Sequence, residues 1–110
     1  MKNIREFYGD TVIDKSDYNE FDSEFKIELA YYKTRGLELL DDKKFGIEIV
    51  KKETDGKKIK VETKEFESIV DTEDKVDNIL EILKRNKVTP IAVNDVLEDM
   101  KVLWFWYYRK

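Results

Sequence analysis

Two alternating segments on either side of Asp55-Gly56 constrain the fold of this chain more than any other feature. Residues Phe45–Thr63 read Phe-Gly-Ile-Glu-Ile-Val-Lys-Lys-Glu-Thr-Asp-Gly-Lys-Lys-Ile-Lys-Val-Glu-Thr. Alternation with a period of two places apolar side chains on one face of a strand, and Asp-Gly between two such runs is a strong hairpin signal. The segment therefore predicts two antiparallel strands.

The register of this hairpin follows if both strands turn their apolar side chains toward one core. The apolar members hold odd positions: Phe45, Ile47, Ile49, Ile59 and Val61. A two-residue loop sets odd positions against even ones, whereas a three-residue loop, Thr54-Asp55-Gly56, keeps the apolar sets together. We therefore expect the three-residue loop, with a positive φ at Gly56 and Glu53 opposite Lys57. Ile49 then lies opposite Val61.

Composition is typical of a soluble globular domain. The chain has 110 residues, of which 42% are charged and 41% hydrophobic, and its net charge is −4. Disorder would require few apolar residues together with a large net charge. A chain of this length suits one domain, and we expect a single domain over residues 1–110.

The residue types that are missing exclude several chemistries. The chain contains no cysteine and no histidine, which excludes disulfides, thiolate and imidazole catalysis and the usual zinc sites. Asp95, Glu98 and Asp99 share one predicted helical face, which we interpret as solvent-facing rather than as a metal site. No apolar run approaches the roughly 20 residues that span a bilayer, and Met1–Glu6 lacks the apolar core of a signal peptide. We expect a cytoplasmic protein with no cofactor, no transmembrane segment and no evident small-molecule substrate.

The N-terminal third of the chain predicts further strands. Asn3–Tyr8 reads as a short strand, which Thr11–Ile13 either extends or follows as a separate strand. Glu24–Lys33 alternates apolar and polar side chains and predicts a half-buried strand. The acidic segment Asp14–Glu24 between them lacks the glycine and terminal glutamate of a calcium-binding EF-hand loop, so we expect a solvated loop.

Two helical patterns complete the chain. Asp71 or Thr72 caps the first helix, and Asn86 ends it. Its apolar side chains recur at helical spacing: Val76, Ile79, Leu80 and Leu83. A second helix runs from Pro90 or Val93 to about Trp104, with an inner face of Val93, Val96, Leu97 and Met100 and then Leu103 or Trp104. The predicted fold is α+β, a three- or four-stranded antiparallel meander followed by two C-terminal helices packed on one face.

Two segments carry a resemblance to a known family. They read Phe45-Gly-Ile-Glu-Ile-Val-Lys-Lys52 and Asn86-Lys-Val-Thr-Pro90, the latter followed by Asp95-Val-Leu-Glu-Asp99. With the helix between them, they resemble short uncharacterised proteins of anaerobic Gram-positive bacteria, a domain of unknown function. Members of that family tend to carry "YGIEI-K" and "N-VTP---L-DVL-D". The resemblance spans roughly Phe45–Met100, with phenylalanine where the family often has tyrosine. It implies a folded unit, but no activity and no catalytic residue.

The aromatic end of the chain is its most unusual feature. Five rings are consecutive: Trp104, Phe105, Trp106, Tyr107 and Tyr108. In a helix they would point nearly all round the axis, and in a strand they would divide between two faces, so some rings need a second surface. Either the chain's own sheet buries them or a partner does, and aromatic residues are enriched in interface cores. We therefore expect a small non-enzymatic protein-interaction or regulatory domain that associates with itself, as a homodimer, or with a protein partner through Trp104–Tyr108.

Nucleic-acid binding is the alternative function. Lysines crowd the hairpin, including Lys51, Lys52, Lys57, Lys58 and Lys60, although the whole chain is acidic. A basic sheet face binds phosphates, but base recognition favours arginine, and the chain has only four arginines. Lysine on exposed strands also prevents edge-to-edge aggregation, which explains the same residues without a ligand.

Overall fold

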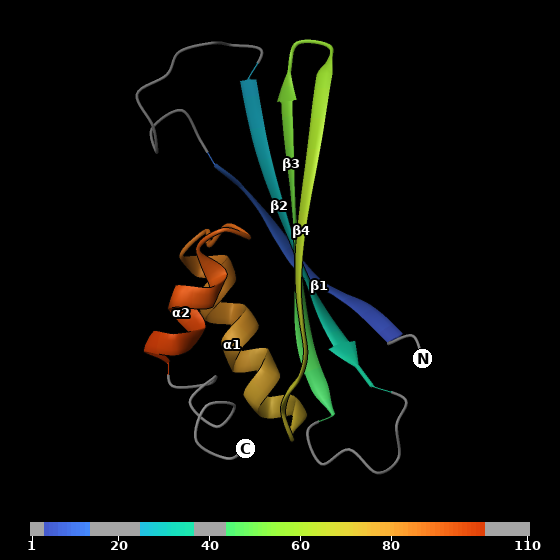
Figure 1. Ribbon diagram of the computed structural model, residues 1–110, viewed down its shortest axis with the longest axis vertical. Coiled ribbons are helices and arrows are strands. Elements are labelled where there is room, and N and C mark those ends of the chain that lie inside the picture. The colour runs from blue at the N-terminus through green and yellow to red at the C-terminus, as the bar shows by residue number, and fades with distance from the viewer. Residues whose placement is uncertain (1–3, 14–24, 37–43, 101–110) are drawn as a thin grey trace.

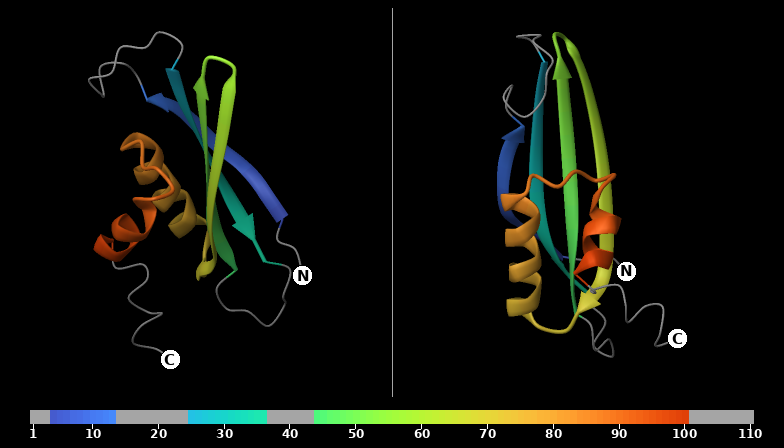
Figure 2. Two further views of the ribbon diagram at one scale, coloured as in Figure 1. Left: turned by 45° about the horizontal axis from the view of Figure 1, so that its top comes forward. Right: turned by 90° about the vertical axis from the view of Figure 1, so that its left-hand side faces the viewer.

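The computed structural model describes residues 4–13, 25–36 and 44–100, which form four strands and two helices. The strands are β1 (Ile4–Ile13), β2 (Phe25–Arg35), β3 (Phe45–Asp55) and β4 (Lys58–Val70), and the helices are α1 (Glu73–Arg85) and α2 (Val93–Asp99). The strands form one antiparallel sheet in sequence order, β1-β2-β3-β4. Both helices lie on the same side of it (Figures 1 and 2). The predicted α+β meander with two covering helices is confirmed, in its four-stranded form.

The N-terminal segment is one strand with an irregularity at Tyr8. The register changes from Phe7 opposite Tyr32 to Gly9 opposite Tyr31, so Tyr8 is the extra residue of a bulge. The bulge turns the Tyr8 side chain toward α1, where its hydroxyl donates a hydrogen bond of 2.8 Å to Glu81. Thr11–Ile13 therefore extends the first strand and does not form another.

The predicted three-residue hairpin loop is wrong. Asp55 pairs with Lys58, which leaves a two-residue turn of Gly56 and Lys57. Gly56 has the expected positive φ of 61°, whereas Lys57 does not, as in a type II′ turn with glycine first. The two-residue turn pairs odd-numbered residues of β3 with even-numbered residues of β4. Ile49 therefore lies opposite Lys64 instead of Val61.

The remaining hairpin pairings change in the same way. Glu53 lies opposite Lys60 and not opposite Lys57. Ile59 and Val61 point away from the helices and are exposed, at 61% and 57%. The assumption of a shared core therefore fails for the apolar residues in the first part of β4.

The physical reason is that the strands are much longer than the helices. β4 has 13 residues and extends roughly 40 Å, whereas α1 has the same number of residues and extends roughly 20 Å. Figure 1 shows the helices beside only one half of the sheet, with the β3–β4 turn projecting beyond them. At the turn there is no helical core for Ile59 and Val61 to face, so turn geometry sets the register.

The core lies between α1, α2 and the covered half of the sheet. It contains the predicted residues Leu29, Tyr31, Phe45, Ile47, Ile49, Val76, Ile79, Leu80, Leu83, Val93 and Leu97, together with Ile69, Val70 and Val88. Val96 and Met100 are partly buried against it. The odd positions of β2 and β3 thus face the helices, as the alternation predicts.

A bulge of three residues in β4 packs over Gly46. Phe45 pairs with Val70 and Ile47 with Phe66, so three residues of β4 oppose Gly46 alone. Ser68, in the middle of the three, has a φ of 55°. A Cβ at Gly46 would lie 2.1 Å from the backbone oxygen of Phe66, so only glycine leaves room for the bulge.

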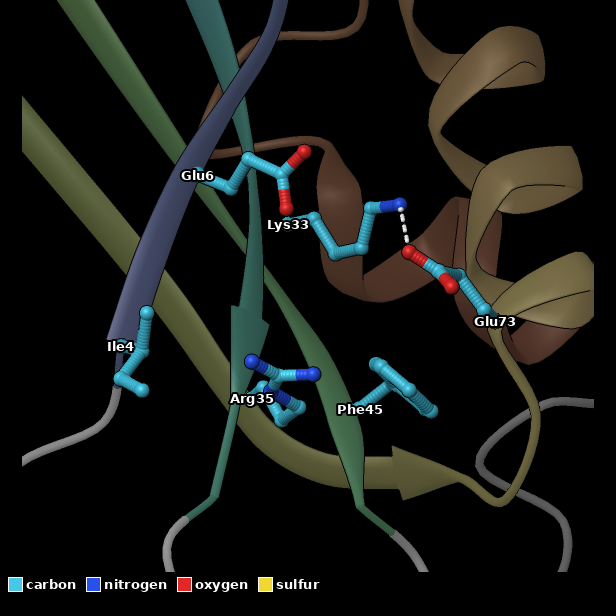
Figure 3. A pocket seen from close by; sticks show the side chains of 6 residues that line it. All are labelled: Ile4, Glu6, Lys33, Arg35, Phe45 and Glu73. Carbon is cyan, nitrogen blue, oxygen red and sulfur yellow. Dashed lines mark hydrogen bonds and ion pairs between the residues drawn. The ribbon is translucent and has the colours of Figure 1, made fainter.

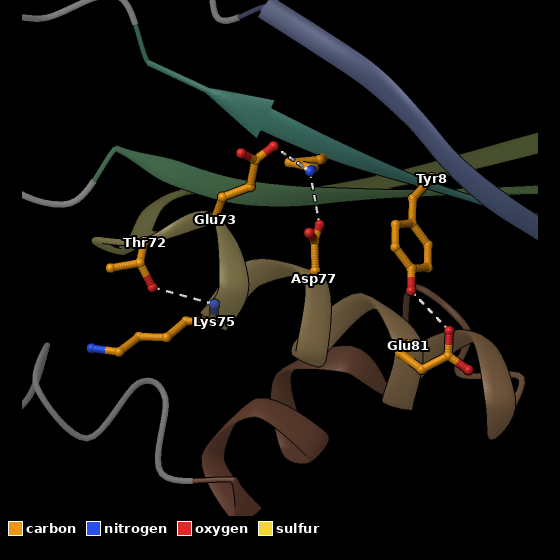
Figure 4. Close-up of polar contacts among 7 residues, drawn as sticks. Tyr8, Thr72, Glu73, Lys75, Asp77 and Glu81 are labelled. Carbon is orange, nitrogen blue, oxygen red and sulfur yellow. Dashed lines mark hydrogen bonds and ion pairs between the residues drawn. The ribbon is translucent and has the colours of Figure 1, made fainter.

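The ends of α1 follow local sequence signals. Thr72 is the N-cap residue, and its hydroxyl accepts a hydrogen bond of 3.3 Å from the backbone N–H of Lys75 (Figure 4). Asn86 is the C-cap, as predicted, and Lys87 follows with a φ of 52°. The N–H of Lys87 donates to Lys84, and that of Val88 to Leu83, which forms a Schellman motif. The helix therefore ends in a left-handed residue that is not glycine.

Helix α2 is shorter than predicted within the described residues. It begins at Val93, one of the two predicted starts, and ends at Asp99 with Met100 as its C-cap. The predicted continuation to Trp104 lies outside the described residues.

Candidate interaction surface

The sheet has one face that no described helix covers, and we call it the open face. Register places on it the even positions of β2 and β3, the odd positions Ile59–Glu65 of β4, and Arg5, Phe7, Asp10 and Val12 of β1. These follow from strand pairing, because residues directly opposite each other share a face. The right-hand view of Figure 2 shows α1 and α2 against the other face.

Apolar side chains run across the open face. Phe7, Val12, Ile59 and Val61 are exposed, at 38% to 61%. Between them lie Ala30 and Val50, a half-buried pair at the centre of the sheet. Phe7 and Val12 belong to one edge strand of the sheet and Ile59 and Val61 to the other, so exposed apolar side chains line both edges of the same face.

One end of the open face is organised around Tyr32. The ring of Phe7 meets that of Tyr32 edge to face, with centroids 5.6 Å apart. The guanidinium of Arg5 lies 4.0 Å from the Tyr32 ring centroid and 3.0 Å from a carboxylate oxygen of Glu48. The hydrogen bond to Glu48 is the main reason that the pKa of Arg5 is raised further above its ordinary value. This end therefore carries a fixed arrangement of two rings and an ion pair.

We call the face of the sheet against α1 and α2 the covered face. Among the described residues, a buried lysine on this face is the side chain that most resembles a catalytic group. Lys33 is 8% exposed, and its ammonium lies 2.7 Å from Glu73 and 2.8 Å from Asp77 on α1 (Figures 3 and 4). Desolvation lowers its pKa, but hydrogen bonds to Asp77 and Glu73 raise it by more, so the net shift is upward. A nucleophilic lysine needs a lowered pKa, so this ammonium joins α1 to the sheet as an ion pair.

The cavity beside Lys33 is too small for a substrate. Its volume is about 20 Å³, and it is lined by Ile4, Glu6, Lys33, Arg35, Phe45 and Glu73 (Figure 3). That volume accommodates about one water molecule. A wider and more open depression lies at the β3–β4 turn, lined by Phe25, Glu53, Asp55, Lys58, Ile59 and Lys60.

Two tyrosine hydroxyls tie the covered face to the helical layer. Tyr31 is fully buried and donates a hydrogen bond of 2.9 Å to the carbonyl of Val88, and burial raises its pKa. Tyr8 donates to Glu81, and this hydrogen bond is the main reason that its pKa is raised (Figure 4). Both hydroxyls are therefore protonated structural donors at neutral pH.

The five lysines proposed for nucleic-acid binding do not share one face. Lys51 is half-buried on the covered face, where it lies 3.0 Å from Glu53 and 3.5 Å from Glu62. Lys60 is on the same face, 3.8 Å from Glu62, whereas Lys52 is on the open face.

The other two lysines lie at the end of the hairpin. Lys57 is in the turn and Lys58 begins β4, and both are exposed. The hairpin thus brings Lys57, Lys58 and Lys60 near its tip and separates Lys52 from them.

The aromatic residues proposed for self-association, Trp104–Tyr108, lie outside the described residues. Within residues 4–13, 25–36 and 44–100, no group of three or more acidic side chains is placed to hold a metal ion. In the same ranges, no helix is long and apolar enough to cross a membrane.

The alternation of β2 and β3 does not predict the open face, because Ala30, Tyr32 and Val50 hold the positions between the core residues of their strands. The sequence feature that indicates this face is the odd numbering of the apolar residues Ile59 and Val61. With a two-residue turn, these residues share a side with Val50, and an apolar surface appears opposite the core.

Comparison with known proteins gives one family. Residues 11–102 match the model of DUF6514, described as a family of unknown function. No curated protein and no solved structure matches the chain. The matched residues extend from the end of β1 through α2, and thus beyond the Phe45–Met100 segment that carries the sequence resemblance. The chain therefore belongs to the DUF6514 family, a family of unknown function.

Proposed function

We propose that this chain is a small protein-interaction domain that does not itself catalyse a reaction. The observation that supports this most directly is the open face, on which Phe7, Val12, Ile59 and Val61 are exposed together. Large apolar side chains exposed on one face of a sheet mark contact sites between proteins. Among the described residues both helices lie on one side of the sheet, which offers its other side to a partner.

The aromatic end is the second part of the proposed interaction surface. Trp104–Tyr108 follow α2 closely in the chain, and large aromatic side chains are the residues most enriched in interface cores. In this proposal, the aromatic end contributes to self-association or to the binding of a protein partner in the cytoplasm.

The polar chemistry of the chain supports a role without catalysis. It has no cysteine or histidine to act as nucleophile or general base at neutral pH. The most buried lysine of the described residues, Lys33, is held protonated by two carboxylates. The hydroxyl of buried Tyr31 likewise has a structural partner, because it donates a hydrogen bond to the Val88 carbonyl.

Site-specific photo-crosslinking in cells that naturally produce the chain tests the interaction role. A photoreactive phenylalanine analogue replaces Phe7 on the open face or Phe105 in the aromatic end of the full chain. The matched control carries the same analogue at Ile91, which is apolar and 85% exposed but lies between the helices, away from the open face.

We expect covalent adducts with protein, either a second copy or another chain, from Phe7 or Phe105 and not from Ile91. Adducts at neither position above the Ile91 background would refute the interaction role. Identification of the adducts by mass spectrometry separates self-association from binding of another protein.

Nucleic-acid binding is the alternative, supported by the exposure of Lys57, Lys58 and Lys60 at the hairpin tip. It requires binding of a labelled oligonucleotide at low salt, with an affinity that falls steeply as salt is added. Replacement of these three lysines with glutamine should then abolish binding. Absence of binding at low salt contradicts this alternative.

A further inference from the structure

One row of residues on the open face has a pattern that is complementary to itself. Glu28 on β2 lies directly beside Lys52 on β3. Val12 on β1 lies at the level of Glu28, and Val61 on β4 lies at the level of Lys52. From β1 to β4 the row therefore reads apolar, acidic, basic, apolar. Read from β4 to β1 it is apolar, basic, acidic, apolar, so a reversed copy places an opposite charge against each charge and an apolar residue against each apolar residue.

A twofold axis converts this pattern into matching contacts between two copies. The axis runs parallel to the strands, midway between β2 and β3, so that β2 of one copy faces β3 of the other and β1 faces β4. Glu28 of each copy then faces Lys52 of the other, and Val12 faces Val61. The two charge contacts and the two apolar contacts arise from one symmetry operation.

The row beside it provides the apolar centre. Ala30 and Val50 are cross-strand neighbours on β2 and β3, so the same axis places Ala30 of one copy against Val50 of the other. Both are half-buried already, and a second sheet would complete their burial. Small apolar residues at the centre allow two sheets to approach to the roughly 10 Å spacing of stacked sheets.

The area of the open face suits a dimer of ordinary size. Four strands spaced about 4.8 Å apart, with about ten residues each, give a planar face on the order of 600 Å². Side-chain relief increases the accessible area above this value. A standard interface buries roughly 800 Å² on each partner.

The charges of the open face favour a second copy over other classes of partner. Both signs are interspersed on it, with Arg5, Lys26 and Lys52 against Asp10, Glu28, Glu48 and Glu65. A nucleic acid or an anionic membrane requires an excess of cations on the contact face. The row of Val12, Glu28, Lys52 and Val61 is complementary to itself, as an isologous interface requires.

We propose that the chain forms a twofold-symmetric dimer through the open face, with Glu28 of each copy against Lys52 of the other. This inference rests on the proposed interaction role and names a second copy of the chain as the partner. The two sheets stack face to face with their strands within about 30° of each other.

Charge exchange between two variants of the full chain tests this geometry. In Glu28→Lys, two lysines of one copy face two of the other, and in Lys52→Glu, four glutamates meet. In an equal mixture, the lysine introduced by Glu28→Lys faces the glutamate introduced by Lys52→Glu. The native Glu28 and Lys52 that remain, one on each variant, also face each other.

The mixture isolates the contact between copies, because the cross-strand repulsion within each copy is the same whether the variants are alone or mixed. Lys57→Glu makes the same change of charge as Lys52→Glu, but in the exposed turn, and is the matched control for that variant.

We expect sedimentation equilibrium to give twice the 13.2 kDa chain mass for the wild type and for Lys57→Glu. The dissociation constant should rise roughly tenfold or more in each single variant. It should return to within about threefold of wild type in the mixture, and a tag on one variant should recover the other. Circular dichroism verifies that both variants remain folded.

Three results overturn the proposal. The first is a wild-type monomer at concentrations on the order of 100 μM, which is too weak for a dimer of this area. The second is a dimer that neither single variant weakens, because its interface then lies elsewhere, for example at Trp104–Tyr108. The third is a dimer that both variants weaken but the mixture does not restore, because Glu28 then does not face Lys52.

Failure of the dimer and failure of the interaction role give different results. A monomer that still yields covalent adducts with another protein from Phe7 overturns the dimer and leaves the interaction role standing. A monomer without adducts at Phe7 or Phe105 overturns both.

Discussion

Replacement of Gly46 with alanine should destabilise the protein more than any other single-methyl change in its strands. The added Cβ would lie 2.1 Å from the backbone oxygen of Phe66, 2.8 Å from the Thr34 hydroxyl and 3.0 Å from the Cα of Glu67. Two of these three neighbours are backbone atoms of the β4 bulge, which cannot rotate away. To reach an ordinary contact of 3.4 Å, the Phe66 carbonyl would have to move by more than 1 Å.

The magnitude follows from two opposing terms. Overpacking of a rigid site costs roughly 1 to 3 kcal/mol, and the backbone contacts at Gly46 place it at the upper end. Loss of the glycine's freedom in the unfolded chain offsets about 0.4 to 1 kcal/mol. We therefore expect the free energy of unfolding to fall by about 2 kcal/mol. At roughly 4 °C per kcal/mol for a domain of this size, the midpoint of thermal unfolding should fall by about 8 °C.

Gly9→Ala is the matched control. Gly9 also lies within a strand, but the three atoms nearest to its added Cβ all belong to the Lys84 side chain, with Cδ at 3.0 Å and Cε at 3.1 Å. The end of a flexible side chain moves at little cost, so we expect a change within about 0.5 kcal/mol.

Urea denaturation of wild type and both variants, at one protein concentration, measures the two changes. A fixed concentration is needed because dimerisation adds to apparent stability. If Gly46→Ala proves as mild as Gly9→Ala, the bulge does not pack against Gly46 as described.

The remaining predictions concern single contacts. Tyr31→Phe removes the hydrogen bond to the buried Val88 carbonyl and should lower the free energy of unfolding by about 1 to 2 kcal/mol in urea denaturation; an unchanged midpoint would contradict the contact. Lys87→Gly should raise the free energy of unfolding by about 1 kcal/mol, because Lys87 has a positive φ that glycine adopts without strain, whereas a decrease would show that its side chain matters more. The pKa of Lys33 is higher in the folded protein than in the unfolded chain, so its ion pairs stabilise fully below the ordinary lysine pKa of 10.5 and lose their effect as pH rises through the folded value. Wild type should therefore lose stability faster than Lys33→Met in unfolding experiments above pH 10.5, and parallel profiles would refute this role.

Local signals in the sequence predicted the elements whose causes are local. The cap at Thr72, the apolar spacing from Val76 to Leu83 and the stop at Asn86 act within one helix, and α1 forms accordingly. Alternation in Glu24–Lys33 and in the first half of β3 likewise placed Leu29 and Ile49 in the core.

The errors concern features that depend on distant parts of the chain. The register of β3 and β4 was derived by assuming one core along the whole hairpin, but α1 covers only half of that length. The bulge at Tyr8 places its hydroxyl against Glu81, 73 residues away, and the bulge in β4 lies over Gly46 beside Thr34, contacts that no local pattern encodes. The open face follows from this unpredicted register, which is why its apolar residues were assigned elsewhere.

Because the hairpin is longer than the helices, its two halves should also differ in how readily their backbone hydrogen bonds open. Amides of β3 near Ile47 and Ile49 lie beneath α1 and should exchange with solvent hydrogen only through cooperative unfolding. Amides from Lys52 to Lys60 lie beyond the helical layer and should exchange through local opening of the projecting arm. The arm carries Ile59, and Val61 follows it in β4, so a second copy that covers the open face would order the same segment that it binds. Hydrogen exchange at the arm would thus slow as protein concentration rises, while exchange beneath α1 would change little.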